Sequence, residues 1–286
     1  MRIWHARRNS EMLLGLLAKH LLRIPLKLVF TSVALRRHSF FPRFLLSKMD
    51  TIIATTQEAA SFVDRCDAII PHGIDTEAFI PPQDKVTAWQ ESGLPGKYGI
   101  GIFGRIRAEK GTDLFVETMC RLLPKYPEFT AIIAGYCKSS DLAFKQSLEQ
   151  KLRDAGIENR VIWLGHVSAE ERHLWFQRIC LCVAPPRYEG FGLTPIEAMS
   201  CGAAVVATRT GVFPTLIEEG KTGHLVNLGD LESLTRAVDG CIADPSGTIQ
   251  KGKAGREHVC RHYDIRQEVT AIEAVYQKLL TISSPQ

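Results

Sequence analysis

The sequence lacks the elements of several common sites. Its eight cysteines form no C-x-x-C pair and no cysteine–histidine cluster with zinc spacing. No D-x-D occurs, and no Ser/His/Asp or Cys/His set points to a covalent nucleophile. The apolar stretch Met12–Ala18 is too short to span a bilayer, and the Lys19 that follows it does not suit a signal peptide. We therefore expect reduced thiols, no metal site and no membrane span.

Positive charge is concentrated in the first segment. Residues 1–48 hold ten Lys and Arg against one acid, a formal charge of +9, whereas the 286-residue chain carries only +4. This imbalance predicts an anionic partner, either an anionic membrane surface or a negatively charged acceptor. A solvated basic face is the alternative. Nucleic acid is not favoured, because no basic helix or aromatic-interleaved motif appears.

Short apolar strands alternate with helices along the chain, which predicts an α/β fold with parallel sheets. We expect a partial domain over residues 1–90 and a complete doubly wound domain over residues 91–264. A closing helix over residues 265–286 is expected to cross back to the first domain. Near the start, Ser10 predicts the N-cap of a largely buried helix over Glu11–Leu22.

The stretch Arg187–Thr208 is the most informative part of the sequence. It follows an apolar strand and places Glu189 and Glu197 on either side of a glycine-containing turn. Thr194 predicts a helix N-cap and Gly202 a helix stop, so the segment forms a strand, a turn and a helix N-terminus that favours anions. Glu197 has two interpretations: it binds a ligand, or it completes a capping box with Thr194.

The whole string resembles the E-x7-E signature of retaining GT-B glycosyltransferases. About ten positions match in order, including the G-F-G and P-x-E-A-M around the two glutamates. Upstream, Gly104–Gly111 resembles the family's G-R-x4-K-G element. The resemblance implies two Rossmann-like domains facing a cleft, no metal cofactor, and a nucleotide-sugar donor.

The resemblance also implies roles for individual residues. Arg105 and Lys110 would hold the donor diphosphate, and Glu189 would lie near the transferred sugar, so these three form the catalytic set. The implied donor-binding set comprises Gly104, Arg105, Lys110, Glu189, Gly190, Phe191, Gly192, Leu193 and Glu197. Glu197 would bind ribose hydroxyls.

The first segment, with Ile3–Asn9 and Phe30–His38, is similar to lipopolysaccharide-core mannosyltransferases of alphaproteobacteria. That similarity implies GDP-mannose as the donor, an anionic glycolipid or glycan acceptor, and a cytoplasmic location at the inner face of the membrane. His5 and Arg7 are candidates for the acceptor side, although His5 also suits a packed, hydrogen-bonded histidine.

Relative to the family pattern, the chain begins near the fourth strand, so the first domain is expected to be incomplete. The missing glycine-rich loop leaves a non-catalytic remnant, which binds nucleotide sugar or membrane, as the alternative function. An epimerase of similar shape, converting UDP-N-acetylglucosamine without an acceptor, is a third hypothesis.

Overall fold

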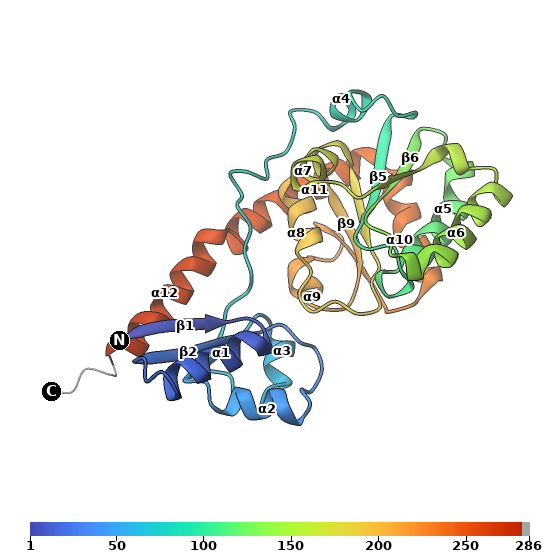
Figure 1. The fold of residues 1–286 in the computed structure, drawn as a ribbon. Helices are drawn as coiled ribbons and strands as arrows, with labels where there is room; N and C mark the ends of the chain where they lie inside the picture. Colours follow the sequence, from blue (N-terminus) through green and yellow to red (C-terminus); the bar gives the residue numbers. More distant parts are fainter. Residues whose placement is uncertain (282–286) are drawn as a thin grey trace. The chain divides into compact units, whose positions relative to one another are not determined.

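The computed structural model describes residues 1–281, and the chain forms two compact units (Figure 1). Unit 1 comprises Met1–Gly73 and the chain from Tyr263 onward, and unit 2 comprises Ile74–His262. The division therefore falls between Gly73 and Ile74 at one end and between His262 and Tyr263 at the other. Residues 74–90, expected in the first domain, belong to unit 2. Among residues 1–281, no helix combines the length and apolarity needed to cross a membrane.

Unit 1 contains a parallel four-stranded sheet in the order β1-β2-β3-β4. The strands are β1 (Arg2–Ala6), β2 (Leu26–Ser32), β3 (Thr51–Ala54) and β4 (Ala68–Ile69), and the helices are α1 (Asn9–His20), α2 (Phe40–Ser47), α3 (Gln57–Ser61) and α12 (Ile265–Thr281). Neighbouring residues of β2 point to opposite faces. Leu28 packs with Met12 and Leu45, whereas Val29 packs near Val275 of α12. The sheet is thus covered on both faces, with α12 returning to it.

Two expectations for α1 are wrong. The helix begins at Asn9 with Arg8 as its N-cap, because the Glu11 carboxylate accepts hydrogen bonds from the amides of Arg7 and Arg8. Ser10 therefore lies inside the first turn. The helix is also not largely buried: of its residues only Met12 and Gly15 are buried. Its outward apolar side chains are Leu13, Leu14 and Leu17.

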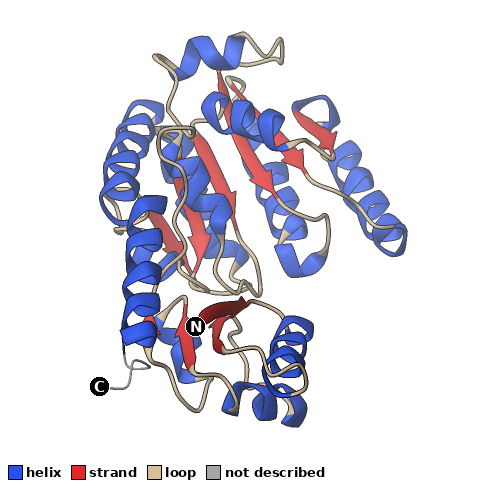
Figure 2. Ribbon diagram, turned by 60° about the vertical axis from the view of Figure 1, so that its left-hand side comes forward, coloured by secondary structure: helices blue, strands red, loops and turns tan. Residues whose placement is uncertain are grey.

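Unit 2 contains a parallel six-stranded sheet in the order β10-β9-β8-β5-β6-β7, with helices on both faces (Figure 2). The strands are β5 (Tyr98–Phe103), β6 (Phe129–Ala134), β7 (Val161–Gly165), β8 (Leu181–Ala184), β9 (Ala204–Thr208) and β10 (Gly223–Val226). The helices are α4 (Lys85–Gln90), α5 (Thr112–Leu122), α6 (Leu142–Asp154), α7 (Ala169–Arg178), α8 (Leu193–Ser200), α9 (Phe213–Leu216), α10 (Leu231–Ala243) and α11 (Pro245–His262). Four short 3-10 turns are η1 (Ala108–Lys110), η2 (Leu123–Lys125), η3 (Ser139–Asp141) and η4 (Glu158–Arg160).

The cysteines are unpaired, as expected. Cys180 is 1% exposed and Cys182 is fully buried, and burial raises the pKa of both thiols to about 12. They are therefore neutral core side chains.

Candidate active site

The candidate site lies at the switch point of the sheet in unit 2. From β5 the chain adds β6 and β7 on one side, then returns to place β8 on the other side of β5. Because β5 and β8 are parallel neighbours, the loops that follow them leave the same edge of the sheet. Ligands of open α/β sheets bind at this position.

The loop after β5 is shaped by close backbone contacts. Gly104 has φ +142°, and its amide donates to the carbonyl of Ala134 over 2.9 Å. A Cβ atom at Gly135 would lie 1.7 Å from the Gly104 oxygen, so the two backbones can approach only with glycine there. The loop presents Arg105, which is exposed and has no hydrogen-bond or ion-pair partner among residues 1–281. Its guanidinium is therefore available to an anion.

The loops after β5 and β8 are fastened to each other. A Cβ atom at Gly111 would lie 2.0 Å from the Pro185 oxygen, so the two loops are in direct contact. The Arg187 amide donates to the Glu109 carbonyl over 2.8 Å. The Arg187 guanidinium also donates two hydrogen bonds, of 2.8 and 2.7 Å, to the Asp113 carboxylate at the start of α5. Two motifs nearly eighty positions apart thus form one continuous surface.

Lys110 and Glu189 meet across this junction. The Lys110 Nζ lies 2.6 Å from the Glu189 Oε2, and the two side chains are about one quarter exposed. The sequence predicted both residues for the site but not their contact.

Helix α8, which follows the turn after β8, begins earlier in the sequence than predicted. Gly192, with φ +99°, is the N-cap of α8, so Thr194 is not the cap and lies inside the first turn. A Cβ atom at Gly192 would lie 2.2 Å from the Phe213 ring. The exposed Leu193 and the half-buried Gly190 leave the turn open to solvent on one side, while Phe191 is 5% exposed and anchors it.

The other end of α8 follows the prediction. Gly202 has φ +76° and its amide donates to the Met199 carbonyl, while the Ala203 amide donates to the Ala198 carbonyl. This pair of bonds is a Schellman motif, which requires the left-handed conformation that glycine adopts readily.

Glu197 is not a capping residue. The residue is 8% exposed, and its Oε1 accepts a 3.1 Å hydrogen bond from Arg172 Nη2 of α7. Burial raises the pKa of Glu197, and Arg172 opposes that effect. The capping-box interpretation is therefore wrong. The nearly buried Glu197 and the partly exposed Arg172 form an ion pair beside the turn.

Arg172 was not predicted from the sequence. It lies on α7, which begins with a capping box. The Glu171 amide donates to the Ser168 hydroxyl over 3.1 Å, and the Ser168 amide donates to the Glu171 carboxylate over 2.7 Å. Nothing in the local pattern distinguishes Arg172 from the other polar residues of this helix. Only the packing of α7 beside α8 brings it to Glu197.

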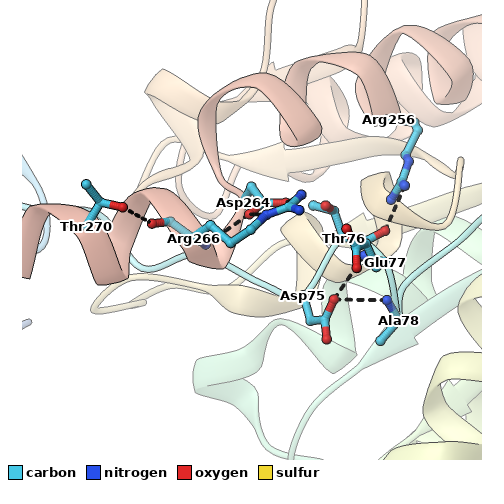
Figure 3. A network of polar contacts seen from close by, with 8 residues as sticks. All are labelled: Asp75, Thr76, Glu77, Ala78, Arg256, Asp264, Arg266 and Thr270. Carbon is cyan, nitrogen blue, oxygen red and sulfur yellow. Dashed lines mark hydrogen bonds and ion pairs between the residues drawn. The ribbon is translucent and has the colours of Figure 1, made fainter.

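Arg256 of α11 supports α8 from its C-terminal end. Its guanidinium donates to the carbonyl of Thr76 over 2.7 Å (Figure 3), and to the carbonyl of Phe79 and the hydroxyl of Ser200 over 2.6 Å each. Asp75 shapes the same segment by accepting from the amides of Glu77 and Ala78 (Figure 3). The helix that carries Glu197 is thus tied to the segment that follows the boundary between the units.

His5 and Arg7 lie in unit 1 and are described within it. The His5 ring nitrogens lie 2.6 Å from the Tyr276 hydroxyl and 2.7 Å from the Thr31 hydroxyl. Burial, with a contribution from Arg7, lowers the pKa of His5 to about 4, so the ring is neutral at pH 7. Arg7 is exposed. Their assignment to the acceptor side stays a prediction.

The part of the chain that the structure describes contains no cluster of three or more His, Cys, Asp or Glu side chains arranged to hold a metal ion. Three cations have been described at the candidate site, namely Arg105, Lys110 and Arg172. Two of them already neutralise the site's glutamates. Arg105 is the cation that lacks a partner among residues 1–281.

Comparisons with known proteins agree with this geometry. The family model described as "Glycosyl transferases group 1" matches residues 97–244. The chain is 44% identical to the lipopolysaccharide core biosynthesis mannosyltransferase LpcC of Rhizobium leguminosarum bv. viciae, over 98% of this chain and 79% of that protein. It is 42% identical to the enzyme LpsB of the same description from Rhizobium meliloti, over 98% and 80%.

Solved structures give the same result. The C-terminal domain of a group 1 glycosyl transferase (LpcC) from Francisella tularensis is 37% identical, with a TM-score of 0.65 over 68% of this chain and all of that one. HepE of Anabaena shares the fold at 22% identity, with a TM-score of 0.86 over 97% of this chain and 79% of that one. The two parallel sheets with their helices match the GT-B fold of such structures. The chain therefore belongs to the group 1 glycosyltransferases of GT-B fold, and it is a glycosyltransferase.

Proposed function

We propose that the protein transfers mannose from GDP-mannose, with retention of configuration, to a glycan of the lipopolysaccharide core. The observation that carries the proposal is the single surface formed by the loops after β5 and β8, with Arg105, Lys110, Glu189 and Glu197 on it. The sequence identity of 44% and 42% to two lipopolysaccharide core mannosyltransferases supports the choice of sugar and acceptor class.

In the proposed reaction, the bond between the mannose anomeric carbon and the phosphate oxygen breaks while a bond to the acceptor oxygen forms on the same face of the sugar. The departing phosphate oxygen takes the proton of the acceptor hydroxyl. The diphosphate gains negative charge as it leaves, and Arg105 and Lys110 would stabilise that charge without a metal ion.

The remaining site residues would position the donor. Glu197 would accept hydrogen bonds from ribose hydroxyls, with Arg172 holding its carboxylate in place. The backbone from Gly190 to Leu193 opens α8 and would bind sugar or phosphate with its amides. Glu189, once Lys110 turns to the diphosphate, would be free to contact the transferred mannose. His5 and Arg7 would lie on the acceptor side.

Because the proposed acceptor is an anionic glycolipid, we also propose a cytoplasmic enzyme that acts at the inner face of the cytoplasmic membrane. Its basic first segment would contact the anionic surface.

The test supplies the purified chain with GDP-mannose and lipopolysaccharide whose core lacks mannose. Transfer, donor hydrolysis and GDP binding are measured separately, and the anomeric configuration of the product is read by NMR. Lys110→Ala should lower transfer about a hundredfold or more, because a partly desolvated cation is lost. Lys125→Ala, an exposed lysine of the same unit, is the matched control.

Unchanged transfer by Lys110→Ala would contradict the assignment of that residue. GDP binding without transfer or hydrolysis would instead indicate the non-catalytic remnant. Transfer from another nucleotide sugar in preference to GDP-mannose would overturn the proposed donor.

A further inference from the structure

Three aromatic side chains of α2 project from unit 1. Phe40 is 87% exposed, Phe41 55% and Phe44 50%. Phe40 and Phe44 are four positions apart and Phe41 and Phe44 three, so the rings share one side of the helix. The opposite side carries Leu45 and Leu46, which are 1% and 5% exposed and pack in the core beneath the sheet. The helix therefore has a core face and a separate aromatic face.

The core explains one face of α2 but not the other. The exposed parts of these rings add little to the stability of unit 1, and clusters of exposed apolar side chains mark interaction surfaces. The neighbouring α1 extends the surface, because α1 and α2 pack side by side (Figure 1). Leu13, Leu14 and Leu17 of α1 are 42–55% exposed.

Basic side chains border the aromatic face. Arg36 and Arg37 are exposed just before α2. Lys48 follows the helix, and its Nζ lies 5.4 Å from the centre of the Phe44 ring. Arg43 is occupied by Asp64, at 3.0 Å, and is therefore left out of this set. No Asp or Glu occurs between Met12 and Met49, so all the charged side chains in this stretch of sequence are basic.

We propose that the aromatic face of α2, formed by Phe40, Phe41 and Phe44 and bordered by Arg36, Arg37 and Lys48, docks onto an anionic lipid bilayer. The rings enter the interface between headgroups and acyl chains, and the cations contact the anionic headgroups. In this placement the aromatic rings leave water, and the basic side chains gain anionic partners.

A second copy of the chain is a poorer occupant. A symmetric dimer brings the same patch of both copies together. In such a dimer, Arg36, Arg37 and Lys48 of one copy would face the same three cations of the other copy. No Asp or Glu occurs between Met12 and Met49 to neutralise them. A bilayer with anionic lipids supplies the missing negative charge. The inference extends the proposed membrane location but does not rest on the proposed chemistry.

The test measures flotation of the intact chain with vesicles of phosphatidylcholine, with and without phosphatidylglycerol, at low and high salt. The chain should bind the anionic vesicles, and binding should weaken with salt. Replacing all three rings (Phe40→Ser, Phe41→Ser, Phe44→Ser) should lower the partition coefficient at least about tenfold. Arg36→Glu with Arg37→Glu should lower it by a similar factor and remove most of the salt dependence.

Matched controls come from exposed positions of unit 2. Leu142→Ser with Leu228→Ser removes apolar side chains that are 48% and 51% exposed, and Lys125→Glu with Lys138→Glu reverses two exposed charges. Both should leave binding unchanged. Circular dichroism confirms that every variant is folded.

Equal binding of the triple Ser variant and the unchanged chain to anionic vesicles would overturn the proposal. So would equal binding to neutral and anionic vesicles, or a dimer in light scattering that the Ser substitutions dissociate. Transfer of mannose to a lipid-free core oligosaccharide should survive the Ser substitutions. Failure of that transfer in the unchanged chain, with vesicle binding intact, would count against the proposed function alone.

Discussion

The ion pair between Glu197 and Arg172 leads to a test of whether Glu197 binds a ligand or only stabilises the fold. Glu197 is 8% exposed, and its Oε1 accepts a hydrogen bond from Arg172, whereas no residue within 1–281 bonds to its Oε2. In the proposed donor complex, that oxygen would accept a hydrogen bond from a ribose hydroxyl. The charge of the carboxylate strengthens any bond that it accepts.

Glu197→Gln should therefore lower the affinity for GDP about tenfold to a hundredfold, because a charge-assisted hydrogen bond is worth roughly 1.5–3 kcal/mol. Calorimetric titration of GDP into both proteins measures the change. Glu171→Gln is the matched control, since Glu171 does complete a capping box, at Ser168, and Gln can replace it there. Equal dissociation constants for Glu197→Gln and the unchanged protein would remove Glu197 from the donor site.

His5 makes a prediction about pH. Burial lowers its pKa from 6.5 to about 4, so between these values an unfolded chain binds a proton that the folded chain excludes. The contribution of His5 to stability is complete above pH 6.5 and is lost as the pH falls toward 4. Because the side chain is partly exposed to solvent, we expect a loss on the order of 1 kcal/mol by pH 5.

Hydrogen exchange of the amides of β1 and β2, followed by mass spectrometry at pH 7 and pH 5, measures this loss of stability. The observed rates are first corrected for the pH dependence of the intrinsic exchange rate. In His5→Gln the pH-dependent loss should shrink, since Gln does not titrate. An imidazole NMR titration of His5 with a midpoint near 6.5 would refute the premise.

At the scale of elements, the turn between β8 and α8 depends on one glycine. Gly192 combines φ +99° with a position where a Cβ atom would lie 2.2 Å from the ring of Phe213, which is 1% exposed and confined. Gly229 also has a positive φ, +73°, but nothing lies within 4 Å of its Cβ position.

Gly192→Ala should cost about 2–3 kcal/mol of unfolding free energy, because a clash adds to the strain of the left-handed backbone. Gly229→Ala should cost only about 1 kcal/mol. Urea unfolding compares the two, and GDP titration should show weaker binding for Gly192→Ala alone. A similar stability loss in both variants would mean that Phe213 moves aside and does not fix the turn.

The elements that were not predicted have weak local patterns. Helix α11, which the sequence analysis does not identify, is an example. α11 contains three glycines, which disfavour helix in isolation. Gly252 instead permits close packing, since its Cβ atom would lie 2.1 Å from the Gly202 oxygen. Tertiary contact thus stabilises a helix that local propensity does not predict.

At the scale of the whole molecule, the charge of the donor is expected to be neutralised by protein cations. No metal-ligating cluster occurs in the chain up to residue 281, and Arg105 and Lys110 lie on the proposed donor surface. Transfer should therefore continue in excess EDTA. A magnesium-dependent transferase assayed in parallel verifies that chelation is complete. Activity that disappears with EDTA and returns with magnesium or manganese would contradict this prediction.

The sequence by itself determined the alternation of strands and helices, the two loops that carry the candidate site, and the family. These features depend on periodicity, on glycines and on capping residues within a few positions, such as the capping box at Ser168 and the Schellman turn at Gly202. Local patterns of this kind can be read without knowing the strand order.

Only the tertiary structure decided which residues of the site touch. The pair Lys110–Glu189 depends on β5 and β8 being neighbours, and the pair Arg172–Glu197 depends on how α7 packs beside α8. It also decided that α2 presents aromatic rings to solvent, because Leu45 and Leu46 take the positions that face the core. Strand order and helix packing arise from contacts between distant segments, and no local pattern encodes them.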